Sequence, residues 1–237
     1  MVQLYSQNHN SDMTEKDLSY VNGHRERLRQ KFLETRLVDY ELMELLLMYA
    51  IPRVDVKPIV KNLLKEFGTV TNILCQPIEE LTRVHGVGQN TAIFLKALMD
   101  VTKREHAAPL RDNPVFYEPS ILENYAKIMF AGKMVEEFHV LYLDGKYKLL
   151  RDDVHSSGTI DWAAIYPREV VRIALNVNAS AVILMHNHPS GNANFSTDDM
   201  KVTRELQSAL NVVGIQLYDH ILVAGGIVFS AKNMQMF

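Results

Sequence analysis

Apolar residues recur at helical spacing along the first part of the chain, which predicts a series of helices there. Residues 57–67 are the plainest case, because Pro58 stands at the start of the apolar stripe and Gly68 follows its end. A very apolar segment at 42–49 predicts a core helix, and residues 23–33 predict a short helix with basic side chains around its apolar stripe. The first part of the chain is therefore predicted to be all-α.

Beyond residue 120 the pattern changes to short apolar runs that alternate with helical segments. The predicted strands are 135–143, 147–154, 181–185, 215–223 and 227–230, and the predicted helices are 120–130, 167–176 and 199–213. Strands interleaved with helices indicate a mixed sheet with helices packed on it.

Three prolines lie among polar residues in the segment 103–119, which predicts a linker between the two parts. We predict a disordered polar tail at residues 1–22, a helical domain at 23–110 and a second domain at 111–237.

Composition narrows the class of protein. The chain is 47% hydrophobic and 22% charged, which is typical of a soluble globular protein. It contains neither an apolar run long enough to span a membrane, about 20 residues, nor the pattern of a signal peptide, so a cytoplasmic location without a membrane partner is expected. The lone cysteine, Cys75, excludes a disulfide framework and a zinc site built from several thiolates. The formal net charge of −3 does not indicate the broad basic surface of a strong nucleic-acid binder.

The stretch 181–200 carries the candidate chemistry. Its apolar start, 181–185, predicts a buried strand that runs directly into His186 and His188. In an extended chain these two imidazoles project to the same side. Ser196 follows after a turn, and Asp199 stands at the start of the next helix.

Each part of this pattern also has a purely structural interpretation. Ser196 and the acids after it are a plausible capping box, and two histidines beside a turn are often ordinary polar loop residues. Strand ends and helix starts are nevertheless where binding groups concentrate. The joint pattern of two imidazoles, a carboxylate and a hydroxyl therefore favours a metal site.

The spacing His186-x-His188, seven residues, Ser196-x-x-Asp199 resembles the signature of the JAMM (MPN-domain) metalloproteases, and the run 186–191 in particular is similar to the bacterial RadC proteins. The resemblance covers nearly the whole chain. It implies an α+β protein: an all-α helix-hairpin-helix domain followed by a JAMM/MPN-like (cytidine-deaminase-like) α/β domain with a mixed sheet. Residues 192–195 depart from the usual RadC-like loop, which bears on loop conformation and substrate fit.

The resemblance also implies roles for the residues. His186, His188 and Asp199 would bind one Zn²⁺ per chain and leave a position open, as in catalytic zinc sites. The family's upstream glutamate matches Glu136, which would act as the general base. Ser196 would donate a hydrogen bond to the oxyanion. Glu137 is rejected as the base because strand alternation sends it to the opposite face. The implied activity is zinc-dependent hydrolysis of a peptide or isopeptide bond in a protein or peptide substrate.

Residues 78–92 resemble a helix-hairpin-helix, with Gly86 and Gly88 in its turn. In that family the glycines let backbone amides approach a DNA phosphate. The alternative interpretation is a tight packing turn. A second function therefore stays open, in which the helical domain binds DNA in a repair-associated role and the metal domain is a scaffold or a nuclease.

Two other enzyme classes fit less well. A zinc deaminase needs a His-x-Glu and a Pro-Cys-x-x-Cys, and the chain has only Cys75. A Ser-His-Asp hydrolase built on Asp219 and His220 lacks a Gly-x-Ser-x-Gly nucleophile elbow, and that pair is expected within or beside a strand. The residues leave open the scissile bond and whether the protein acts as a homo-oligomer.

Overall fold

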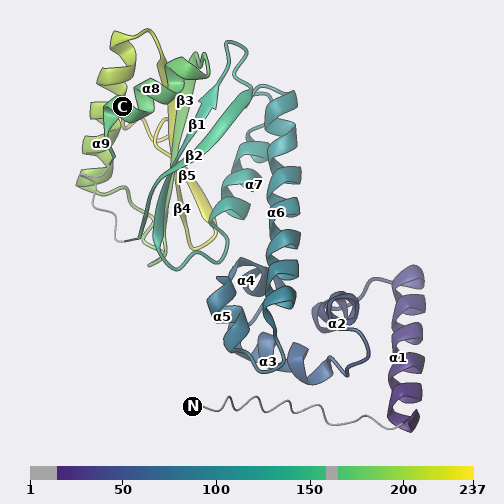
Figure 1. Ribbon diagram of the computed structural model, residues 1–237. Coiled ribbons are helices and arrows are strands. Elements are labelled where there is room, and N and C mark those ends of the chain that lie inside the picture. Colours follow the sequence, from purple (N-terminus) through teal and green to yellow (C-terminus); the bar gives the residue numbers. More distant parts are fainter. Residues whose placement is uncertain (1–14, 159–164) are drawn as a thin grey trace, which may run out of the picture. The chain divides into compact units, whose positions relative to one another are not determined.

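The computed structural model describes residues 15–158 and 165–237 (Figure 1). The chain divides into two compact units. The first contains residues up to Ile73 and Pro77–Leu95, and the second contains Leu74–Gln76 and Lys96–Phe237. The division at Leu95 lies within a helix, N-terminal to the predicted boundary at residues 110–111.

Helices make up the first unit, as the apolar spacing predicts. They are α1 (Glu15–Glu34), α2 (Asp39–Ala50), α3 (Lys57–Phe67), most of α4 (Val70–Cys75), α5 (Ile78–Arg83) and the start of α6 (Gln89–Asp112). Their shared core includes fully buried side chains, among them Met43, Leu47, Val60, Leu63, Leu81 and Leu95. Each of these lies on the apolar stripe of its helix, so burial of these stripes holds the unit together.

Two helices extend further than predicted. α1 begins at Glu15, earlier than the expected start at Gly23, because a glycine inside a helix costs only about 1 kcal/mol. The rest of the predicted tail, residues 1–14, lies outside the described residues. The linker prediction for 103–119 is wrong up to Asp112, because α6 continues through Pro109. Burial of Ala107 and Leu110 offsets the lost helical hydrogen bond.

A five-stranded mixed sheet forms the centre of the second unit, which confirms the predicted fold class. Its strands are β1 (Glu136–Leu143), β2 (Leu149–Gly158), β3 (Ala181–His188), β4 (Gln216–Ala224) and β5 (Ile227–Ser230). Their order is β2-β1-β3-β4-β5. Only the β3–β4 pair is parallel among these, and the other neighbours are antiparallel. β3 is therefore the middle strand, buried along its whole length.

Helices cover both faces of this sheet (Figure 1). One face packs against α8 (Pro167–Asn176) and α9 (Thr197–Val212), through a core that includes Phe138, Val140 and Leu184. The other face packs against α7 (Pro119–Phe130) and the end of α6. Because side chains alternate along a strand, the apolar side chains of β1 divide between the two cores: Phe138, Val140 and Tyr142 lie in the first, and Leu141 and Leu143 in the second.

Among residues 15–158 and 165–237, no helix has both the length and the apolar character that crossing a membrane requires.

Candidate metal centre

His186 and His188 lie at the C-terminal end of β3, and their side chains project to the face of the sheet that α9 covers. The strand is extended through both residues, so their imidazoles project to the same side. His186 is fully buried and His188 is 8% exposed. The central strand thus delivers two imidazoles to the edge of the core beneath α9.

Asp199 reaches the same place from the first turn of α9. Ser196 is the N-cap residue: its Oγ accepts a hydrogen bond from the Asp199 amide at 3.0 Å. The Ser196 amide donates to Asp199 Oδ2 at 2.6 Å. The two residues therefore form the capping box, and the same box holds the Asp199 carboxylate over the histidines. The structural and the metal interpretations of this motif are compatible.

The three side chains meet in one cluster. One ligand atom from each of His186, His188 and Asp199 lies within 4.8 Å of the others. His186 Nε2 is 3.2 Å from His188 Nε2 and 3.4 Å from Asp199 Oδ1, and His188 Nε2 is 3.5 Å from Asp199 Oδ2. Two nitrogens and a carboxylate at these separations suit a small cation such as zinc.

The burial and the protonation of these groups suit metal binding. Asp199 Oδ1 is buried, and no group in the described part of the chain gives it a well-formed hydrogen bond. An unsatisfied buried carboxylate oxygen is costly, and a cation would remove that cost. Burial opposes ionisation of Asp199, but contacts with His186 and Ser196 outweigh it and lower the pKa to about 2. Burial lowers the pKa of His186, and Asp199 only partly offsets this. A neutral imidazole and a carboxylate are the forms that bind metals.

Glu136 begins β1 on the same face of the sheet. Phe138 pairs with His186, so Glu136, two residues earlier, projects to the side of the metal cluster. The Asn187 side chain secures this strand start: its Oδ1 accepts from the Glu137 amide at 2.8 Å, and its Nδ2 donates to the Val135 carbonyl at 3.0 Å. These two peptide groups flank Glu136. Asn187 therefore holds the backbone of Glu136 beside the two histidines.

Glu137 points to the opposite face, as strand alternation predicts. Its carboxylate is 2.6 Å from Lys133 Nζ and 3.3 Å from His139 Nε2. The other ring nitrogen of His139 lies 3.0 Å from Asp152. Burial opposes ionisation of Glu137, but His139 and Lys133 outweigh it and lower the pKa to about 2. Glu137 thus belongs to a buried ion network on the far side of the sheet.

The predicted helix-hairpin-helix glycines lie between α5 and α6 in the first unit. Gly86 has a φ of +91°, and a Cβ added there would stand 2.7 Å from Ile59 of α3. A Cβ added at Gly88 would meet nothing within 4 Å. Packing therefore accounts for Gly86, whereas the fold does not require a glycine at position 88. DNA contact by either residue stays a prediction.

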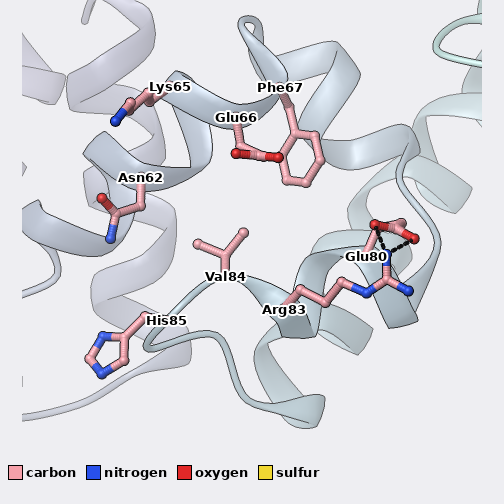
Figure 2. Close-up of a pocket in the computed structure, with 8 residues that line it drawn as sticks. All are labelled: Asn62, Lys65, Glu66, Phe67, Glu80, Arg83, Val84 and His85. Carbon is pink, nitrogen blue, oxygen red and sulfur yellow. Dashed lines mark hydrogen bonds and ion pairs between the residues drawn. The ribbon is translucent and has the colours of Figure 1, made fainter.

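A hollow of about 360 Å³ lies beside this turn, lined by residues that include Lys65, Glu66, Arg83 and His85. Figure 2 shows Phe67 and Val84 facing into it, with the Arg83 guanidinium paired to Glu80. Acidic and basic side chains are mixed here, and the pairing of Arg83 further reduces the positive charge offered to a phosphate. The residues that line this hollow therefore do not form the basic patch that is typical of strong nucleic-acid binders.

The two glycines give a matched pair of variants. Gly86→Ala is expected to lower the free energy of unfolding by about 1–3 kcal/mol, because alanine is strained at this φ and its Cβ displaces Ile59. Gly88→Ala should cost less than about 1 kcal/mol. Urea unfolding followed by circular dichroism measures both. Equal losses would contradict the packing role of Gly86.

His220 and Thr203 also border the metal cluster, although the metal-site prediction does not include them. His220 Nε2 is 2.8 Å from His186 Nδ1, and His220 Nδ1 is 2.7 Å from Thr203 Oγ. Complete burial lowers the pKa of His220 well below its ordinary value. The only sequence signal for His220 was strand alternation, which places it on one of the two faces of β4. Which of these faces lies under α9 depends on how the strands pair in the sheet.

Comparison with known proteins gives two similarities. Residues 116–236 match the RadC-like JAB domain family. A UPF0758 protein from Ruegeria pomeroyi is 40% identical over 217 residues, which cover 90% of this chain and 97% of that protein. The first similarity spans the sheet and the metal cluster, and the second extends into the helical unit.

Proposed function

This chain belongs to the RadC family of JAB-domain proteins, and we propose that it is a zinc-dependent peptidase of the JAMM type that hydrolyses a peptide or isopeptide bond. The observation that carries the proposal is the cluster of His186, His188 and Asp199, in which a buried carboxylate oxygen lacks a donor within the described residues. Three ligands from the protein leave a coordination position open, as catalytic zinc sites do.

The ligands come from two elements, β3 and the start of α9. His186 Nε2, His188 Nε2 and a carboxylate oxygen of Asp199 would hold the ion. The chemistry that zinc supplies when bound is Lewis acidity, which lowers the pKa of water and polarises a carbonyl oxygen. β3 and the α9 capping box hold the three ligand side chains close together, which would preorganise the site for the ion.

Glu136 and Ser196 would perform the remaining steps. The Glu136 carboxylate takes a proton from the attacking water and gives it to the amine nitrogen as the C–N bond breaks. Ser196 Oγ accepts from the Asp199 amide, so its own proton stays available for the oxyanion that forms on the attacked carbonyl. Ser196 is exposed whereas Asp199 is fully buried, which allows a substrate to approach from the Ser196 side.

The test is the metal content of purified protein after dialysis with zinc, measured by plasma mass spectrometry and followed by a peptide-library hydrolysis screen. We expect about one zinc per chain, lost in His186→Ala. His85→Ala, which removes an exposed histidine of the helical unit, is the control and should keep the metal. Native protein that retains no zinc would contradict the proposal, and so would zinc-loaded protein that cleaves no peptide or isopeptide bond.

A further inference from the structure

A buried histidine of β4 lies directly behind the first metal ligand. β3 and β4 run parallel with Leu184 opposite His220, so His220 projects to the same face as His186. His220 is fully buried, and the rings of Phe138 and Phe195 lie 5.9 and 5.2 Å from its ring. Complete removal from water disfavours a charged imidazolium. His220 is therefore a neutral ring with one N–H and one unprotonated nitrogen.

Thr203 determines which nitrogen carries that proton. Its Oγ lies 2.6 Å from the Asp199 backbone carbonyl and 2.7 Å from His220 Nδ1. A carbonyl oxygen can only accept, so the single hydroxyl proton of Thr203 goes to Asp199. The short contact with His220 then requires Nδ1–H as the donor. This leaves His220 Nε2 unprotonated.

The chain of hydrogen bonds continues to the metal cluster. His220 Nε2 must accept from His186 Nδ1–H across their 2.8 Å contact. His186 Nε2 then carries the lone pair, the form that can bind a metal. The opposite tautomer would leave His186 Nδ1 and His220 Nε2 facing each other at 2.8 Å with no proton between them. Its N–H on Nε2 would lie 3.2 Å from His188 Nε2 and 3.4 Å from Asp199 Oδ1. The contact with Asp199 is long for a charge-assisted bond, which is about 2.7–2.9 Å.

We propose that Thr203 and His220 are positioning residues that fix the tautomer of His186 in which Nε2 is free of a proton and faces the metal site. The inference rests on the proposed function, because it concerns the same site. The relay starts and ends at Asp199: its backbone carbonyl orients Thr203, and its side chain meets His186 in the cluster. Asp199 of α9 thus supplies one metal ligand and also helps to fix the tautomer of another ligand, His186 on β3.

Thr203→Val tests the relay with little change in shape. Valine offers no acceptor, so His220 Nδ1–H would be buried without a partner, which costs about 1–3 kcal/mol. His220 then shifts its proton to Nε2 and donates to His186, which moves the His186 proton onto the ligand nitrogen. Zinc affinity, measured by competition with a chromophoric chelator, is expected to fall about 10- to 100-fold. Thr203→Ser keeps the hydroxyl and should restore most of the affinity.

Ser208→Ala is the control, because Ser208 donates to the Arg204 carbonyl in the same helix but lies outside the site. It should leave zinc affinity unchanged. Thr203→Val protein that binds zinc as tightly as the native chain would overturn the proposal. Native protein that binds no zinc would instead contradict the proposed function.

A second measurement reads the tautomer without a metal. Long-range ¹H–¹⁵N spectra of zinc-free protein distinguish Nδ1–H from Nε2–H histidines. We expect His186 as Nδ1–H in native and Thr203→Ser protein, and as Nε2–H in Thr203→Val. If Thr203→Val does not fold, His220→Gln and His220→Leu replace it, since only glutamine offers both an acceptor and a donor. A native His186 with Nε2–H would overturn the relay.

Discussion

Glu136→Gln is expected to reduce turnover by about 100- to 10,000-fold while zinc content stays at the native level. Glutamine keeps the shape of the side chain but cannot take a proton from water. Glu136 is not part of the metal cluster, so the ligands remain in place. The measurement pairs initial rates on a cleaved peptide with metal content of the same samples. Native turnover in Glu136→Gln would assign the base to another group.

The adjacent Glu137 offers a matched control on the opposite face of β1. Glu137→Gln should retain turnover but lower the free energy of unfolding by about 1.5–3 kcal/mol, because it weakens bonds to Lys133 and His139. The pKa of Glu137 is lowered from 4.5 to about 2. Its stabilisation is therefore present above pH 4.5 and is lost as the pH falls toward 2. Urea titrations across this range should show the loss in native protein and not in Glu137→Gln.

The parts of the site that are local in sequence could be predicted. The two histidines share a face because a strand alternates, and Asp199 returns through a capping box that spans four residues. Glu136 is distant in sequence, and only the family resemblance pointed to it. Strand alternation then separated it from Glu137.

The remaining parts depend on long-range packing. His220 faces His186 only because β3 and β4 pair with an irregularity between Val182 and Ile183, and no local pattern encodes that register. The role of Gly86 likewise depends on Ile59 of another helix. The sequence alone predicts that a helix ends near Pro109. The helix continues because the neighbours of Pro109 are buried. In each case a contact from a distant element overrides or completes the local signal.

Asp199→Asn is expected to abolish the stabilisation that zinc gives the native protein. In native protein this gain is about 2.7 kcal/mol when zinc is 100-fold above its dissociation constant. Asparagine keeps an oxygen for the Ser196 amide, so α9 stays capped. It replaces the buried Oδ1 with an NH₂ group, which cannot bind a cation and carries no charge. Urea unfolding with and without zinc measures the difference.

Asp198→Asn is the control for this change. Asp198 and Asp199 both lie in the first turn of α9, so each variant removes one acidic charge from the same helix start. Asp198 is exposed and outside the cluster, whereas Asp199 is fully buried within it. Zinc should therefore stabilise Asp198→Asn as much as native protein and leave Asp199→Asn unchanged. Equal stabilisation of both variants would mean that zinc binds elsewhere on the chain. Only Asp199→Asn removes the carboxylate that lies beside the two histidines.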